Sequence, residues 1–153
     1  MREEKFTSPM TVENATFGDS AVDGLLAGVG AGLVMAVVMA AAGLLQGEPV
    51  LALLRRFAPG GEATALAGLL AHMAVSSVYG LVFALLRRSW PWRRGWPVPV
   101  VGLLYGIGLL LLAQTVLLRS SDLTLAELPA GVLVAGHVVY GLVLGWLLSK
   151  IGR

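Results

Sequence analysis

Two histidines lie inside stretches of this chain that are otherwise apolar. His72 stands in GLLAHMAVSSVYG and His137 stands in AGHVVYGLVLG. An imidazole nitrogen can ligate a metal or a haem iron, move a proton or hydrogen-bond a backbone carbonyl. Because an ionisable side chain among apolar residues is costly unless it has a partner, each histidine is a candidate site residue.

The two imidazoles are predicted to lie at similar depths. Each precedes a basic residue at the end of its apolar stretch, Arg87 or Lys150, by a similar number of residues. At about 1.5 Å per helical residue, their heights differ by about 3 Å. His72 and His137 could therefore ligate one haem b axially. Alternatively, each imidazole could form a structural hydrogen bond to a carbonyl or to a Tyr hydroxyl. A pigment, quinone or proton-handling role is a third interpretation.

The segments that carry these histidines have the length and composition of membrane-spanning helices. Of the 153 residues, 57% are hydrophobic and 13% are charged, about half the usual charged fraction of a soluble domain. A helix of about 20 apolar residues crosses a hydrocarbon core of about 30 Å. We predict an all-α membrane protein with a polar cytoplasmic N-terminal arm, 1–20, and a transmembrane domain, 21–153. Its four spans are predicted at about 21–46, 63–86, 97–118 and 126–149.

The basic residues predict the orientation. Eight of the 11 Lys and Arg residues lie on the N-terminal arm, the middle loop or the C-terminus, and three lie on the other two loops. The positive-inside rule then predicts a multi-pass protein of the bacterial inner membrane with both termini in the cytoplasm. These basic residues sit at membrane borders, so no nucleic-acid partner is predicted.

Two sequence motifs occur twice, in the same order. GLLAGVG at 24–30 is matched by GLLYGIG at 102–108, and Tyr-Gly-Leu-Val occurs at 79–82 and at 140–143. We therefore predict two tandem helical hairpins that form a parallel repeat, related by an axis near the membrane normal.

Small residues recur at helical spacing along the predicted spans. Such rows let helix backbones approach closely, which drives helix association in lipid. The residues predicted to pack helices together are Gly24, Gly28, Gly32, Gly68, Gly80, Gly102, Gly106, Gly141 and Gly145.

Two segments between the spans are amphipathic. One interleaves arginines with tryptophans, a composition that suits lipid headgroups or an acidic partner subunit. Its predicted interface residues are Arg87, Arg88, Trp90, Trp92, Arg93, Arg94 and Trp96. The other, EPVLALLRRFAPGG at 48–61, has the apolar spacing of a short helix that lies on the membrane surface.

The sequence contains no cysteine and none of the common catalytic motifs, so we predict that it is not an enzyme and has no metal site. The preferred function is a small accessory or structural subunit, packed by its glycine-rich faces within a larger bacterial respiratory or photosynthetic membrane complex. Its partners would be the lipid bilayer and other integral membrane subunits. One alternative is a haem-binding subunit with His72 and His137 as ligands, haem b being the cofactor considered. The other is a small homo-oligomeric carrier or channel lined by Gln114, Thr115 and serines.

Overall fold

The computed structural model describes residues 16–58, 64–89, 96–117 and 128–151, and these residues are almost entirely helical. Within them, four helices are long and apolar enough to cross a membrane, which confirms the prediction of four long apolar helices and indicates a multi-pass membrane protein. The elements are α1 (Phe17–Leu44), α2 (Val50–Arg55), α3 (Ala65–Ser89), α4 (Val98–Leu112), the π-helical η1 (Ala113–Leu117) and α6 (Ala130–Ile151).

Helix α1 begins earlier than the predicted start at residue 21. Thr16 is its N-cap and forms a capping box with Asp19, whose carboxylate accepts from the Thr16 backbone N–H at 2.7 Å. The Thr16 hydroxyl in turn accepts from the Asp19 backbone N–H at 3.1 Å. Because these bonds satisfy backbone groups that a helix start leaves unpaired, the polar residues before the apolar stretch join the helix.

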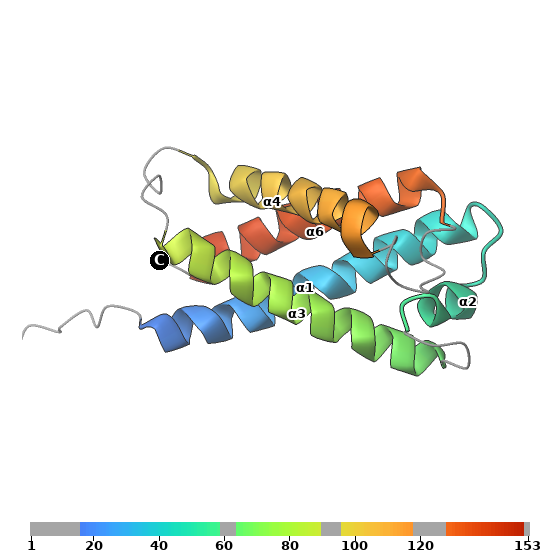
Figure 1. Ribbon diagram of the computed structural model, residues 1–153, viewed down its shortest axis with the longest axis horizontal. Coiled ribbons are helices and arrows are strands. Elements are labelled where there is room, and N and C mark those ends of the chain that lie inside the picture. Colours follow the sequence, from blue (N-terminus) through green and yellow to red (C-terminus); the bar gives the residue numbers. More distant parts are fainter. Residues whose placement is uncertain (1–15, 59–63, 90–95, 118–127, 152–153) are drawn as a thin grey trace, which may run out of the picture.

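The four long helices pack as two antiparallel pairs, α1 with α3 and α4 with α6, and contacts between α1 and α6 join the pairs. The starts of α1 and α4 and the ends of α3 and α6 lie at one end of the bundle, and α2 lies at the other (Figure 1). The short helix α2 packs on α3 and α1, and its Leu53 is fully buried there. The apolar side of segment 48–61, which was predicted to lie on the membrane surface, therefore faces the bundle in part.

Glycine makes the α1–α3 contact possible. A Cβ atom at Gly80 would meet the Gly24 carbonyl and the backbone of Gly28. A Cβ atom at Gly28 would lie 3.0 Å from the Gly80 Cα and closer still to the Ser76 carbonyl. The two helices therefore touch backbone to backbone, with no room for a side chain between them.

The α4–α6 contact uses the matching residues. A Cβ atom at Gly141 would meet the Gly102 carbonyl and lie 3.1 Å from the Gly106 Cα. A Cβ atom at Gly145 would lie 2.8 Å from the Cα of Pro99. Gly102, Gly106 and Gly141 occupy the places in the second sequence motif pair that Gly24, Gly28 and Gly80 occupy in the first, so equivalent positions make equivalent contacts.

The other predicted packing glycines also lie against neighbouring elements. A Cβ atom at Gly32 would overlap the Ser76 side chain, and one at Gly68 would overlap the Leu54 carbonyl of α2. The glycine rows are thus occupied by helices of this chain.

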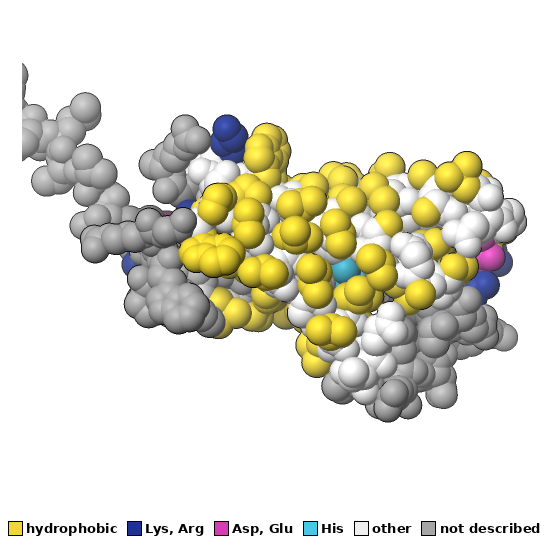
Figure 2. All heavy atoms as spheres, turned by 90° about the horizontal axis from the view of Figure 1, so that it is seen from above, with side chains coloured by type: hydrophobic (Ala, Val, Ile, Leu, Met, Phe, Trp, Pro, Cys, Tyr) yellow, Lys and Arg dark blue, Asp and Glu magenta, His cyan; other side chains and the backbone are white. Residues whose placement is uncertain are grey.

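The outer surface of the bundle is apolar. Leucines such as Leu26 and Leu66 are about two-thirds exposed, at 66% and 65%. Figure 2 shows hydrophobic side chains spread over the length of one face, with the charged groups near its ends. Such a surface suits a lipid bilayer, where apolar side chains face hydrocarbon.

Arginine side chains tie helix ends together at the end of the bundle where α3 finishes. Arg87 Nη1 donates to the Leu148 carbonyl in the last turns of α6 at 2.7 Å. The Arg88 guanidinium lies 4.4 Å from the centre of the Phe17 ring and donates to the Ser20 hydroxyl. Trp96 is 59% exposed, as a residue at a lipid interface would be. The remaining predicted interface residues, Trp90, Trp92, Arg93 and Arg94, lie outside the described residues.

Candidate functional site

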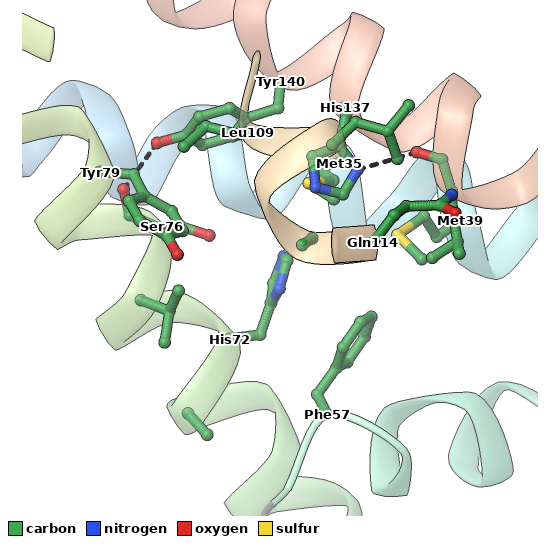
Figure 3. A pocket seen from close by; sticks show the side chains of 15 residues that line it. Met35, Met39, Phe57, His72, Ser76, Tyr79, Leu109, Gln114, His137 and Tyr140 are labelled. Carbon is green, nitrogen blue, oxygen red and sulfur yellow. Dashed lines mark hydrogen bonds between the residues drawn. The ribbon is translucent and has the colours of Figure 1, made fainter. Parts of the chain in front are cut away.

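A cavity of about 270 Å³ lies between the two helix pairs, in the half of the bundle nearest α2. Its walls come from α1, α3, the end of α4 with η1, and α6, and Phe57 closes the side next to α2. His72 and His137 both line it (Figure 3). The structure therefore brings the two predicted site residues to one space, as their similar depths suggest.

His72 is held by α1 and by Phe57, which lies in the turn after α2. Its Nε2 lies 3.1 Å from the Gly32 carbonyl oxygen. The absence of a side chain at Gly32 lets α3 come close enough to α1 for this bond to form. On its other side, the imidazole stacks on the Phe57 ring with 4.5 Å between centroids and 25° between planes.

His137 is held by its own helix. Its Nδ1 lies 2.9 Å from the carbonyl oxygen of Leu133, one turn earlier in α6. Nearby, a Cβ atom at Gly136 would lie 2.9 Å from the Met39 sulfur, so α6 approaches α1 closely at this level. Figure 3 shows Met35 beside the His137 ring and Met39 beside Gln114, and both methionines belong to the apolar part of the cavity wall.

The α4 side of the cavity has an irregular backbone. The α-helix changes into the π-helix η1 at Ala113, and Gln114 of this segment lines the cavity. Short π-helical segments are rare and occur frequently at functional sites. The other side chain in η1 that was considered as a channel lining, Thr115, donates instead to the carbonyl of Leu111 in its own helix at 2.7 Å.

Two tyrosines connect α3 with the α4–α6 pair at the edge of the cavity. The Tyr140 hydroxyl donates to the Ser76 carbonyl at 2.7 Å, and the Tyr105 hydroxyl donates to the Tyr79 carbonyl at 2.9 Å. The Tyr140 side chain is 2% exposed. Neither hydroxyl is paired with a histidine, because each histidine bonds a backbone carbonyl instead.

Each histidine thus bonds a backbone carbonyl, which is the arrangement that the structural interpretation predicts. The sequence did not indicate Phe57, Met35 or Met39 as residues of the site. The spacing of Val50, Leu53, Leu54 and Phe57 was a signal for one buried side of this segment, but it did not point to His72.

The size of the cavity and the bond at His72 both bear on haem ligation. A cavity of about 150 Å³ holds one benzene ring, and a porphyrin links four pyrrole rings, so it needs several times that volume. His72 Nε2 is also directed to the Gly32 carbonyl. Binding haem between His72 and His137 therefore requires the helices to separate further, and the haem alternative stays a prediction. Among the described residues, no cluster of three or more metal-ligating side chains occurs.

Comparison of this chain with protein-family models, with curated proteins and with solved structures gives no match.

Proposed function

We propose that this chain is a small, non-enzymatic subunit of a larger bacterial membrane complex, and that it holds one ring-sized, largely apolar molecule inside the bilayer. The observation that carries this proposal is the cavity of about 270 Å³ into which one histidine from each helix pair projects. Binding sites for small molecules are mostly apolar spaces with a few converging polar groups, and this cavity has that composition.

The exposed apolar faces of the helices support the proposal that the chain works within a larger assembly. The glycine rows are filled by helices of the same chain, so they do not serve external partners. The outer faces, with side chains such as Leu26 and Leu66, are free to contact lipid or the helices of other subunits. Among the described residues, the four long apolar helices are of the kind that associates with other helices within a membrane.

We further propose that the two helix pairs are tandem copies of one hairpin and that both termini lie in the cytoplasm of the bacterial inner membrane. The equivalent backbone contacts of Gly80 and Gly141 support the duplication. The arginines at the end of α3, Arg87 and Arg88, support the orientation because basic residues are retained on the cytoplasmic side.

Cysteine labelling tests the orientation. The chain has no cysteine of its own, so each introduced thiol reports alone. With Cys at Ser20, Gly60, Gly95 or Ser121, a membrane-impermeant maleimide added to intact spheroplasts should label only the variants at 60 and 121. Labelling after membrane disruption is the control for reactivity, and the opposite pattern on intact spheroplasts would reverse the proposed topology.

Analysis of the gently extracted protein tests the binding function. We expect a particle larger than the 16.0 kDa chain that carries a small molecule, detectable by native mass spectrometry and by solvent extraction. Ala71 lines the cavity, so Ala71→Phe should fill it and remove the small molecule. Ala74 lies on the exposed side of the same helix, and Ala74→Phe is the matched control that should retain it.

Three results would count against the proposal. A stable monomer of 16.0 kDa without co-purifying chains would overturn the subunit setting. Equal small-molecule content in the variants at Ala71 and Ala74 would place the molecule outside the cavity. An absorption spectrum of bound haem in the same sample would show that the ligand is haem and not a single-ring molecule.

A further inference from the structure

We propose that the cavity selects a ligand that donates hydrogen bonds: a single aromatic ring that carries hydroxyl groups, of the hydroquinone or phenol class. This inference rests on the proposed binding function and adds the chemical class of the ligand. It follows from which nitrogen of each histidine is already bonded.

The carbonyl bonds fix the tautomers of both imidazoles. A carbonyl oxygen only accepts, so the ring nitrogen that faces it must carry the proton. That nitrogen is Nε2 in His72, opposite Gly32, and Nδ1 in His137, opposite Leu133. A charged imidazole within a bilayer is costly, and a neutral imidazole carries only one proton. His72 Nδ1 and His137 Nε2 are therefore unprotonated nitrogens that can only accept.

These two acceptors are available to a ligand. Neither nitrogen has a hydrogen-bond partner among the described residues. Every fully buried side-chain nitrogen or oxygen of the described residues does have a partner, so these two nitrogens are not fully buried. Both nitrogens therefore border open space, and both histidines line the cavity. An acceptor in such a place is best satisfied by a donor on the bound molecule.

The other polar groups of the cavity do not oppose this preference. The Tyr140 proton is already donated to the Ser76 carbonyl. The hydroxyls of Ser76 and Tyr79 can either donate or accept, and the Gln114 amide carries both a donor and an acceptor, whereas an unprotonated imidazole nitrogen has one role. The fixed hydrogen-bonding demand of the cavity is thus for donors.

Volume and lining indicate a single ring. A cavity of about 150 Å³ holds benzene, so a space of about 270 Å³ holds one six-membered ring with small substituents. Met35, Met39 and Leu109 are among the apolar residues of the wall, and methionine sulfur makes favourable contacts with aromatic rings. In Figure 2 a histidine side chain is visible in the middle of an apolar face, so the wall of this cavity reaches the lipid-facing surface. An alkyl chain on the ring can extend there.

The acceptors come from different helix pairs, His72 from α3 and His137 from α6. A ring with two hydroxyl groups can donate to one nitrogen on each. A hydroquinone would then be preferred to a ring of similar size that carries only acceptors, because in the latter both imidazole nitrogens stay unsatisfied.

Imidazole ¹⁵N NMR of the full chain in lipid nanodiscs tests the premise. The sequence has only two histidines, so single variants assign every signal. We expect opposite tautomers, with the proton on Nε2 in His72 and on Nδ1 in His137. The same tautomer in both rings, or a protonated imidazolium in either, would overturn the inference without reference to any ligand.

Binding of matched probes tests the selectivity. The probes are a short-chain alkylhydroquinone, its dimethyl ether and the corresponding alkylbenzene, with affinities expressed per mole fraction in the bilayer. The two probes without hydroxyls are one larger and one smaller than the hydroquinone, so size alone cannot favour it. We expect the hydroquinone to bind about tenfold more tightly than either, which is the difference that one or two net hydrogen bonds make.

Two variants replace the unprotonated imidazole nitrogen with an amide oxygen in a different position and keep a donor for the structural bond. In His72→Gln the amide nitrogen replaces Nε2 as the donor to Gly32, and in His137→Asn it replaces Nδ1 as the donor to Leu133. The ratio of hydroquinone to ether affinity should fall in each variant and fall furthest in the double variant, because the amide oxygens do not occupy the places of the two imidazole nitrogens. Ser149→Ala, whose hydroxyl bonds the Trp146 carbonyl in α6, is the control and should leave the ratio unchanged.

The outcomes separate the two proposals. Equal affinity for all three probes, with loss of binding in Ala71→Phe, would keep the cavity as a binding site and overturn the selection of donors. Binding of no probe at the cavity would overturn both. If the ratio of hydroquinone to ether affinity stays at about ten in the double variant, the hydroxyl groups do not contact the histidines and the inference is overturned.

Discussion

Gly106→Leu should prevent the α4–α6 pair from forming, whereas Gly108→Leu, two residues along the same helix, should leave the protein folded. A Cβ atom at Gly106 would meet the His137 carbonyl and lie 3.1 Å from the Gly141 Cα, and these are backbone atoms that cannot move aside. A Cβ atom at Gly108 meets nothing within 4 Å, and this residue is exposed. The two substitutions therefore add the same side chain to opposite environments.

The expected size of the effect follows from overpacking. Inserting a few carbon atoms into a packed contact costs about 1–3 kcal/mol, and a whole leucine side chain should cost at least the upper figure. With alanine the clash is smaller and is offset in part by the helix preference of alanine over glycine, about 1 kcal/mol. Gly106→Ala should then be modestly destabilised and Gly108→Ala should be neutral or slightly stabilised.

Unfolding of the purified variants by increasing mole fractions of a denaturing detergent measures these differences. The second pair of positions, Gly141→Ala against Gly131→Ala in α6, repeats the comparison, because a Cβ atom at Gly131 also meets nothing. If the substitutions at Gly106 and Gly108 have equal effects, the close contact of α4 with α6 does not exist in the membrane.

Phe57→Ala should destabilise the protein by about 3 kcal/mol, the lower end of the cost of truncating a buried phenylalanine. The Phe57 side chain is 8% exposed and stacks on the His72 ring. Its removal leaves a space beside an imidazole and takes away the group that closes the cavity next to α2. Leu51→Ala is the matched control, because Leu51 lies in the adjacent α2 and is 62% exposed; it should change stability by less than about 0.5 kcal/mol.

A second measurement separates loss of packing from opening of the cavity. A water-soluble reagent that modifies imidazole should react with His72 faster in Phe57→Ala than in the parent or in Leu51→Ala, as counted by mass spectrometry. An unchanged rate, together with a stability equal to that of the control, would mean that Phe57 does not cover His72.

The four long helices could be predicted because the charged residues are segregated. A span of more than 20 uncharged residues has few alternatives to a membrane helix, since lipid requires every backbone group to be satisfied within the segment. The start of α1 was harder to predict. Thr16 and Asp19 lie among polar residues, and their reciprocal bonds extend the helix beyond the apolar stretch.

The meeting of the two histidines was predictable from their depth along helices that run in one direction. The change to a π-helix at Ala113 was not, because it is a shift of backbone hydrogen bonds within a continuous apolar segment. The stacking of Phe57 on His72 depends on the path of the chain after α2, which periodicity does not describe. The cavity itself is a property of how two pairs of helices meet, and no single segment contains it.

The glycine contacts also have a consequence for the order of events during synthesis. Each set of glycine contacts joins two long helices that follow one another in the chain, α1 with α3 and α4 with α6. The first hairpin can therefore close as soon as Ser89 has left the ribosome, before the second hairpin exists. The walls around His72 and His137 come together only when the finished hairpins dock through α1 and α6. A bound molecule would then enter last and hold two independently inserted units together.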